Sequence, residues 1–339
     1  MRNFEQAIFM KLIDCHAHCL PPTILDALRE FAAGSYLGRS LYADEGFSSL
    51  EKHLTLMDRF GVEKEVINYG NLLIPAARAR KLPMEEVVKM VNDYIAEASR
   101  IAPGRFVPAA AVDPYGGEAA LQELDRAVEK LGLFGISLST NIDGRALDDP
   151  IYEPIFERAK AWNMPLWVHP GQVPAAWQQA LGLNNRYLNS GVGFLLDDML
   201  CLIKMITANV FDRWWGVKFV FCQLGGFLPF TMGRFDQQFF FERRVYEQEK
   251  RPLPQYLQRR VIEYCQAFYV DTHTADASAI HCALDCMTAD RIVLGGDYPI
   301  SPPEIGLGYT IPQLDKAGLA ASDRAKIERG NATKLLNLP

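Results

Sequence analysis

The sequence lacks several features that would assign the chain to a broad class of protein. It has no apolar run of membrane-spanning length, and residues 1–9 lack the apolar core of a signal peptide and carry Glu5. Its 35 basic and 41 acidic residues give a formal net charge of −6, which argues against nucleic acid or an anionic membrane as the main partner. We therefore expect a cytoplasmic globular protein.

Cysteine pairs typical of metal or redox motifs are also absent. The seven cysteines are an odd number and none forms a CxxC pair. Several lie in apolar runs, which predicts reduced, buried thiols rather than a disulfide framework. The same prediction holds for Cys15 and Cys222, although both lie next to candidate site residues.

The sequence does contain a regular alternation of apolar, strand-like segments and amphipathic, helix-like segments. Strands are expected at residues 12–18, 65–69, 106–112, 133–139, 165–169, 217–222, 268–271 and 291–294, with helices between them and no Pro/Ser-rich linker. Continuous apolar strands that alternate with helices indicate a parallel sheet buried on both faces. Eight such units predict an α/β fold of the (β/α)8 TIM-barrel type.

The expected domain organisation is simple. Residues 1–10 are predicted to be an N-terminal extension, and residues 11–339 a single barrel domain. Two longer segments interrupt the alternation, at residues 34–47 and 171–195. We expect these to be inserted loops or helices at the C-terminal face of the barrel, long enough to cover a site.

Polar residues stand at the ends of several predicted strands. His16 and His18 end the first strand, and their i, i+2 spacing places both imidazoles on one side of it. The others are His169 on the fifth strand, Gln223 after the sixth, Asp271 and His273 at the seventh, and Asp297 after the eighth. Strand ends converge at the C-terminal face of a barrel, where active sites form.

Three histidines and a carboxylate are a natural ligand set for a catalytic transition metal with an open coordination position. We therefore predict a metal site at His16, His18, His169 and Asp297. Each residue alone has a plainer interpretation: His169 as a core histidine, or Asp297 as a turn cap. The prediction depends on their occurrence at matching strand ends.

Several short motifs lie along the chain: IDCHAH at 13–18, VHP at 168–170, GGFLP at 225–229 with GRFD at 233–236, GGDYP at 295–299, and NATKLL at 331–336. By these motifs the chain resembles the amidohydrolase superfamily, in the branch of aminocarboxymuconate-semialdehyde decarboxylase and related aromatic-acid decarboxylases. The resemblance covers about residues 11–338. It implies that His16, His18, His169 and Asp297 are the metal ligands.

Gln223 departs from the family pattern. The sixth strand normally ends in HxGG, with a proton-handling histidine, whereas this chain reads QLGG at 223–226. A neutral amide can orient a water or a substrate oxygen but cannot accept a proton near neutral pH. Three interpretations remain open: a deliberately inactivated variant, a natural enzyme with another base such as His273, or a protein that binds without catalysis.

The number of metal ions is predicted from the lack of a lysine at the end of the fourth strand. Binuclear members of the superfamily carry a bridging carboxylated lysine at the end of the fourth strand, and residues 136–140 read ISLST. One divalent ion is therefore expected. Zinc is the first expectation, with manganese or iron as alternatives.

The resemblance implies non-oxidative decarboxylation of an aromatic or unsaturated carboxylic acid by a carboxy-lyase. Asp297 is the expected proton carrier if Gln223 is native, and Arg39 and Arg186 are candidates to bind the anionic end of a small-molecule substrate. A metal-dependent hydrolase or hydratase would use the same ligands. The resemblance also implies a homodimer or higher homo-oligomer, and Arg234 and Asp236 are expected to hold the helix after the sixth strand in place.

Overall fold

The structure is a computed structural model that describes residues 11–31, 45–171, 179–180, 182 and 186–338. The predicted N-terminal extension at residues 1–10 and most of the predicted loop at 34–47, including Arg39, lie outside the described residues.

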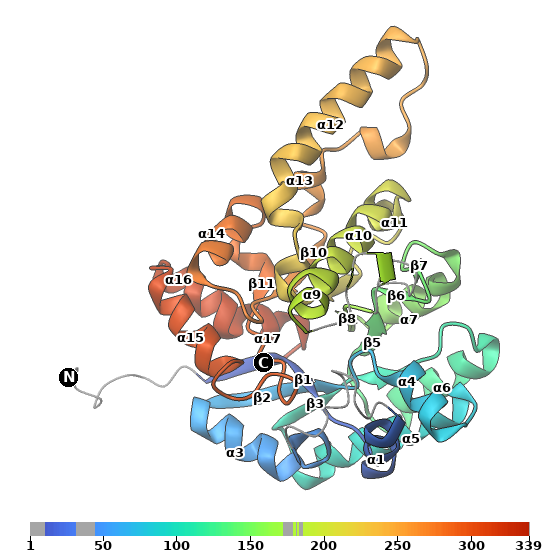
Figure 1. The fold of residues 1–339 in the computed structure, drawn as a ribbon, viewed down its shortest axis with the longest axis vertical. Coiled ribbons are helices and arrows are strands. Elements are labelled where there is room, and N and C mark those ends of the chain that lie inside the picture. The colour runs from blue at the N-terminus through green and yellow to red at the C-terminus, as the bar shows by residue number, and fades with distance from the viewer. Residues whose placement is uncertain (1–10, 32–44, 172–178, 181, 183–185, 339) are drawn as a thin grey trace.

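Parallel strands occupy eight positions around a closed barrel (Figure 1). They are β1 (Leu12–His18), β2 (Val62–Asn68), β3 (Phe106–Pro108) continued by β4 (Ala110–Ala111), β5 (Ile136–Ser139), β8 (Pro165–His169), β9 (Lys218–Phe221), β10 (Phe268–Asp271) and β11 (Ile292–Val293). The predicted (β/α)8 fold is confirmed.

Two junctions close the ring between the ladders β1-β2-β3 and β11-β10-β9-β8-β5-β4. Between β3 and β4 the chain changes partner: Ala109 N donates to Ile67 O of β2 at 2.9 Å, and Ala110 N donates to Gly135 O beside β5 at 2.9 Å. On the other side, Cys15 N donates to Leu294 O at 2.9 Å and His18 N to Tyr298 O at 2.7 Å. Strand β1 is thereby joined to the segment that carries Asp297.

The helices lie mostly between the strands, as expected. They are α1 (Pro22–Phe31), α3 (Leu50–Phe60), α4 (Leu73–Arg80), α5 (Met84–Ile101), α6 (Gly117–Glu129), α7 (Glu153–Ala161), α9 (Arg186–Leu188), α10 (Phe194–Thr207), α11 (Val210–Arg213), α12 (Leu228–Gln248), α13 (Val261–Tyr264), α14 (Ala277–Cys286), α15 (Leu307–Lys316), α16 (Ala321–Ala325) and α17 (Asn331–Leu335). A short hairpin, β6 (Asn141–Ile142) and β7 (Arg145–Ala146), follows β5.

Local sequence explains well-defined ends such as those of α3. Ser49 caps its first turn by accepting a hydrogen bond from Lys52 N, and Gly61 ends it with φ 72°. The chain then enters β2 directly at Val62.

A small apolar cluster joins strand residues to the last helix. Ile13, Cys15, Val66, Trp167 and Val220 contact one another, together with Ala332, Leu335 and Leu336 at α17. The larger cluster packs the other strand faces against the surrounding helices. All seven cysteines are free thiols, as predicted.

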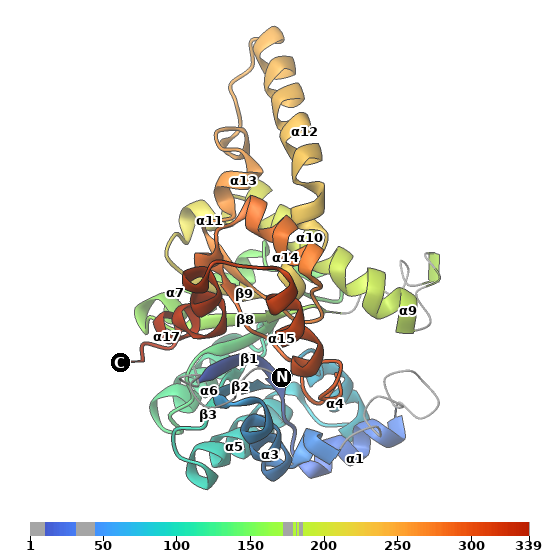
Figure 2. The same ribbon diagram turned by 90° about the vertical axis from the view of Figure 1, so that its left-hand side faces the viewer.

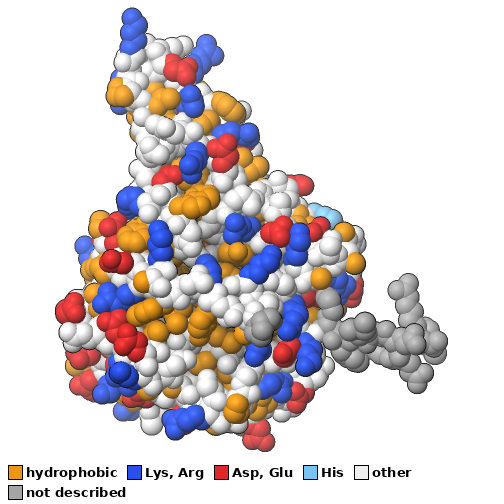
Figure 3. All heavy atoms as spheres, turned by 180° about the vertical axis from the view of Figure 1, so that it is seen from behind, with side chains coloured by type: hydrophobic (Ala, Val, Ile, Leu, Met, Phe, Trp, Pro, Cys, Tyr) orange, Lys and Arg blue, Asp and Glu red, His pale blue; other side chains and the backbone are white. Residues whose placement is uncertain are grey.

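Helix α12 projects away from the barrel in both ribbon views (Figures 1 and 2). On the face shown in Figure 3, acidic and basic side chains are interspersed and apolar side chains reach onto this projection. Among the described helices, none is long and apolar enough to cross a membrane.

Candidate metal centre

Strand β1 brings two imidazoles to the carboxyl end of the barrel. Its residues are all buried, and His16 and His18 are 2% and 1% exposed. Asp14 holds the end of β1 against the segment that contains Gly296. Its Oδ1 accepts hydrogen bonds from His16 N at 3.0 Å and from Gly296 N at 2.9 Å. The next residue, Asp297, donates its own N–H to His16 O at 2.6 Å. The backbone thus places the Asp297 carboxylate beside both histidines.

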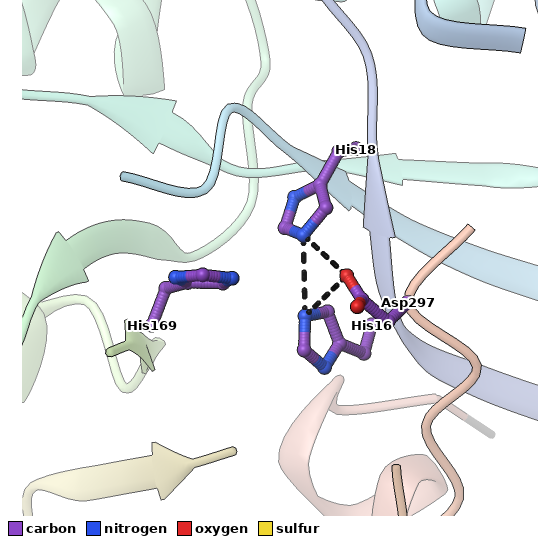
Figure 4. A group of neighbouring side chains, drawn as sticks. All are labelled: His16, His18, His169 and Asp297. Carbon is purple, nitrogen blue, oxygen red and sulfur yellow. Dashed lines mark hydrogen bonds and ion pairs between the residues drawn. The ribbon is translucent and has the colours of Figure 1, made fainter. Parts of the chain in front are cut away.

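The four predicted ligands come together (Figure 4). One ligand atom from each of His16, His18, His169 and Asp297 lies within 4.8 Å of the others. His16 Nε2 and His18 Nε2 are 3.2 Å apart, and Asp297 Oδ1 lies 3.2 and 2.9 Å from them. His169, from β8, faces the group from the other side, with ring centroids 5.0 Å from His18 and 5.5 Å from His16.

A hydrogen-bond acceptor fixes the tautomer of each β1 histidine. His16 Nδ1 lies 2.8 Å from Asp271 Oδ2, and His18 Nδ1 lies 2.9 Å from Asn68 Oδ1. The Asn68 oxygen is identified by Gly70 N, which donates to it at 2.7 Å. Each Nδ1 is therefore the donor, and each ring in its neutral form presents the lone pair of Nε2 to the centre.

His169 is oriented in the same way. Its Nδ1 donates to the carbonyl of Pro170 at 2.8 Å, so its Nε2 is also an acceptor. Burial, reinforced by His18 and His16, lowers the pKa of His169 to about 3. His169 is consequently neutral at ordinary pH, which is the form that binds a metal.

These side chains fit a divalent cation better than they fit one another. With both rings neutral, two Nε2 lone pairs face each other at 3.2 Å and leave no N–H donor for the buried Asp297 Oδ1, which lies 3.2 and 2.9 Å from them. Burial opposes the charge of Asp297, but His273 and His16 outweigh it and hold the pKa of Asp297 well below its ordinary value. An ionised carboxylate and three imidazoles that converge on one point have the donor chemistry of a transition-metal site.

A proton and a metal ion compete for His16. Burial opposes protonation of this ring, whereas the negative charges of Asp271 and Asp297 favour it, and the pKa of His16 lies above its ordinary value. The Cys222 Sγ lies 3.8 Å from His16 Nε2, and burial raises the pKa of the thiol. Cys222 is therefore a buried thiol rather than a thiolate nucleophile.

Gln223 follows β9 in a strained turn. Residues 223–226 all have positive φ, which glycine accepts at 225 and 226 but Gln223 and Leu224 do not favour. The Gln223 N–H donates to Asp271 Oδ1 at 2.9 Å. Its side-chain Oε1 is buried and has no hydrogen-bond partner among the described residues.

His273 lies within the same group of side chains. Its Nε2 is 3.1 Å from Asp297 Oδ2, and its buried Nδ1 has no partner in the described part of the chain. Strand β10 positions it, since Asp271 Oδ1 accepts a hydrogen bond from His273 N at 3.0 Å. An imidazole therefore stands next to the carboxylate even though Gln223 carries none.

The structure places neither side chain of the two arginines predicted to bind substrate. Arg39 lies outside the described residues, and Arg186 begins α9 but its side chain is not described. Sequence reasoning also missed Asn68, which orients His18. Its only sequence indication is a polar residue at the end of an apolar strand.

The fold and this cluster together define the class of protein. It is a (β/α)8 barrel that carries three histidines and one aspartate at the ends of its strands. The family model described as Amidohydrolase matches residues 13–338, so the chain belongs to the amidohydrolase family. A curated relative, 2-amino-3-carboxymuconate-6-semialdehyde decarboxylase of Dictyostelium discoideum, is 28% identical over 96% of this chain and 91% of its own length.

Solved structures share the fold. A 2,6-dihydroxybenzoate decarboxylase complexed with 2,6-dihydroxybenzoate superposes with a TM-score of 0.79 at 22% identity, over 96% of this chain and 99% of its own. A dihydroxybenzoic acid decarboxylase of Polaromonas sp. JS666, with bound manganese and 2-nitroresorcinol, has a TM-score of 0.76 at 21% identity and covers 96% of each chain.

Proposed function

We propose that the protein is a metal-dependent, non-oxidative decarboxylase of an aromatic or unsaturated carboxylic acid. The observation that carries this proposal is the convergence of His16, His18, His169 and Asp297 in an amidohydrolase barrel. The relatives support it, because the Dictyostelium protein and both solved structures are named decarboxylases of unsaturated or aromatic acids. Residues 11–339 form the catalytic domain.

His16, His18, His169 and Asp297 would hold a single divalent ion. Zinc suits three imidazoles and a carboxylate, with iron as an alternative, and manganese has the support of the Polaromonas structure. When bound, the ion supplies positive charge for the substrate carboxylate and an adjacent oxygen.

Proton delivery falls to this chain's own residues. Asp297 Oδ2 and His273 Nε2 are 3.1 Å apart, a distance at which a proton passes directly between them. Asp297 carries the proton to the carbon that loses CO2, and His273 replenishes it through its unpartnered Nδ1. Gln223, a neutral amide, orients the substrate, while Arg39 and Arg186 bind its anionic end.

The test is to incubate the metal-loaded protein with a panel of hydroxybenzoates and muconate-type acids and to measure CO2 release. In D2O, the product should carry deuterium at the carbon that lost CO2. Conversion of the panel without CO2 would favour the hydrolase or hydratase alternative. Binding of an acid without any turnover would favour a non-enzymatic protein.

A further inference from the structure

Asp198, in the first half of α10, is a buried carboxyl group without a partner. Its residue is 0% exposed, and neither Oδ1 nor Oδ2 makes a hydrogen bond within the described part of the chain. The adjacent Asp197 differs: its carboxylate accepts hydrogen bonds from Thr140, from Asn141 Nδ2 at 2.8 Å and from Gly171 N at 2.8 Å. Asp197 thus connects α10 to the loops after β5 and β8 by hydrogen bonds, whereas Asp198 makes no such connection.

Asp198 packs behind the Gln223 turn. A Cβ added at Gly226 would lie 3.1 Å from the Asp198 Cβ and 2.0 Å from Leu195 O, so α10 presses directly on this turn. The start of the same turn is linked to the metal centre through Asp271, because Gln223 N donates to Asp271 Oδ1 at 2.9 Å. The other oxygen of Asp271 accepts from His16.

The surroundings of Asp198 favour its neutral form. Burial raises the pKa of Asp198 well above its ordinary value, the negative charges of Asp197 and Asp271 raise it further, and His16 opposes them. Each packed element contributes titratable groups: Asp197 and Cys201 from α10, Cys222 next to β9, Asp271 from β10 and His16 from β1. A buried, unpaired carboxylate is far less stable than the corresponding acid, which favours the protonated form of Asp198.

Two acceptors are linked to the same turn, because Gln223 begins it and His273 N donates to the same Asp271 Oδ1 as Gln223 N. Gln223 Oε1 and His273 Nδ1 are both buried and lack partners among the described residues. Unpartnered polar atoms gathered in one region commonly mark the place of an ordered water. An acid that packs against Gly226 at the end of the turn, and acceptors linked to Gln223 at its start, can serve as the two ends of a proton path through water.

We propose that Asp198 is the proton reservoir of this site, a positioning acid that acts through water beside Gln223. The proposal rests on the decarboxylase function above. As the Asp198 O–H bond breaks, a proton passes along the water to His273 Nδ1, and His273 passes its Nε2 proton to Asp297. Asp297 then forms the new C–H bond at the carbon that carries the carboxylate. The C–C bond then breaks, CO2 leaves, and its electron pair stays with the carbon framework. Asp198 remains as a carboxylate and regains a proton from solvent.

Infrared spectroscopy tests the acid without any substrate. The wild type at neutral pH should show a carboxylic-acid C=O band that is absent from Asp198→Asn and retained in Asp197→Asn. Labelling with ¹³C-aspartate should shift that band, which assigns it in the wild type. Identical spectra of the wild type and Asp198→Asn, or a band lost only in Asp197→Asn, would overturn the proposal.

Kinetics test the transfer. Asp198→Asn should keep the metal content and thermal midpoint of the wild type, since an amide replaces an unpaired acid, yet lose about 10²-fold in kcat. The wild-type rate should fall at high pH as Asp198 loses its proton, and the variant should lack that limb. Wild-type kcat and pH profile in a folded Asp198→Asn would overturn the proposal. No CO2 from the wild type would instead refute the decarboxylase function, and the infrared result would stand separately.

Discussion

At the scale of single residues, the site depends on the groups that orient its histidines. Asp271, Asn68 and the Pro170 carbonyl each accept a hydrogen bond from the Nδ1–H of one ring, so every Nε2 faces the centre. The sequence alone indicated the histidines as candidate ligands because they stand at strand ends. It could not identify Asn68 or Asp198, because their roles depend on partners, or on the lack of partners, far away in the chain.

The first residue-scale prediction concerns metal content. Removing both β1 imidazoles in His16→Ala/His18→Ala leaves two of the four proposed ligands, so the variant should retain little metal. Elemental analysis after dialysis measures the ratio of metal to protein. His281→Ala is the matched control, since this histidine lies on α14 outside the cluster, and it should keep about one ion per chain. Stoichiometric metal in the double variant would contradict the ligand assignment.

The second residue-scale prediction separates the interpretations of Gln223. In a natural enzyme whose working imidazole is His273, His273→Ala should lower kcat by about 10²–10⁴-fold, the usual contribution of general acid–base catalysis. Gln223→His should then bring no gain, because another imidazole crowds the substrate or binds the metal. Steady-state kinetics on a confirmed substrate measures both variants.

A gain of activity in Gln223→His would be the opposite result. A gain of about 10²–10⁴-fold in Gln223→His would identify Gln223 as an inactivating replacement of a histidine. No change in either variant would show that neither position handles protons.

At the scale of elements, the strand order was predictable and the strand boundaries were less so. Apolar runs located all eight positions, but β2 begins at Val62 rather than residue 65 because it follows the Gly61 cap directly. Glu65 is buried in β2, where its Oε1 lies 2.5 Å from Nδ1 of His53 on α3. This pairing offsets the cost of burying the carboxylate. The predicted strand 106–112 is interrupted at Ala109, where the chain changes partner. Such pairings are properties of the folded barrel, not of local sequence.

The connection between α12 and α13 gives an element-scale prediction. Asp236 accepts hydrogen bonds from Arg260, including Arg260 Nε at 3.1 Å, whereas Arg234 donates to Gln237 of its own helix at 2.7 Å. Asp236→Asn should therefore lower the free energy of unfolding by about 0.5–1 kcal/mol, the range for a partly exposed ion pair. Arg234→Gln should change it by less than about 0.5 kcal/mol.

Urea unfolding of the two variants beside the wild type measures both values. Turnover by the folded Asp236→Asn protein should match the wild type, because Asp236 is predicted to be structural. A fully stable and inactive Asp236→Asn variant would contradict that role.

At the scale of the whole molecule, α12 leaves apolar surface uncovered. Phe230, Phe240 and Phe241 are 84%, 57% and 64% exposed on a helix that projects from the barrel (Figure 2). Large exposed aromatic side chains grouped on one element are typical of protein–protein interfaces. This surface is where the predicted homodimer or higher homo-oligomer would form.

Replacing the two neighbouring aromatics tests that prediction. Phe240→Ser/Phe241→Ser should weaken self-association by about tenfold or more, because buried aromatic anchors carry most of the binding energy of an interface. Sedimentation velocity over a range of protein concentrations measures the change, and an unaltered far-UV circular dichroism spectrum verifies the fold. Phe31→Ser is the matched control, since Phe31 on α1 is 57% exposed but lies away from α12. A wild type that sediments as a monomer at all concentrations, or a double variant that associates as tightly as Phe31→Ser, would show that α12 does not join two copies of the chain.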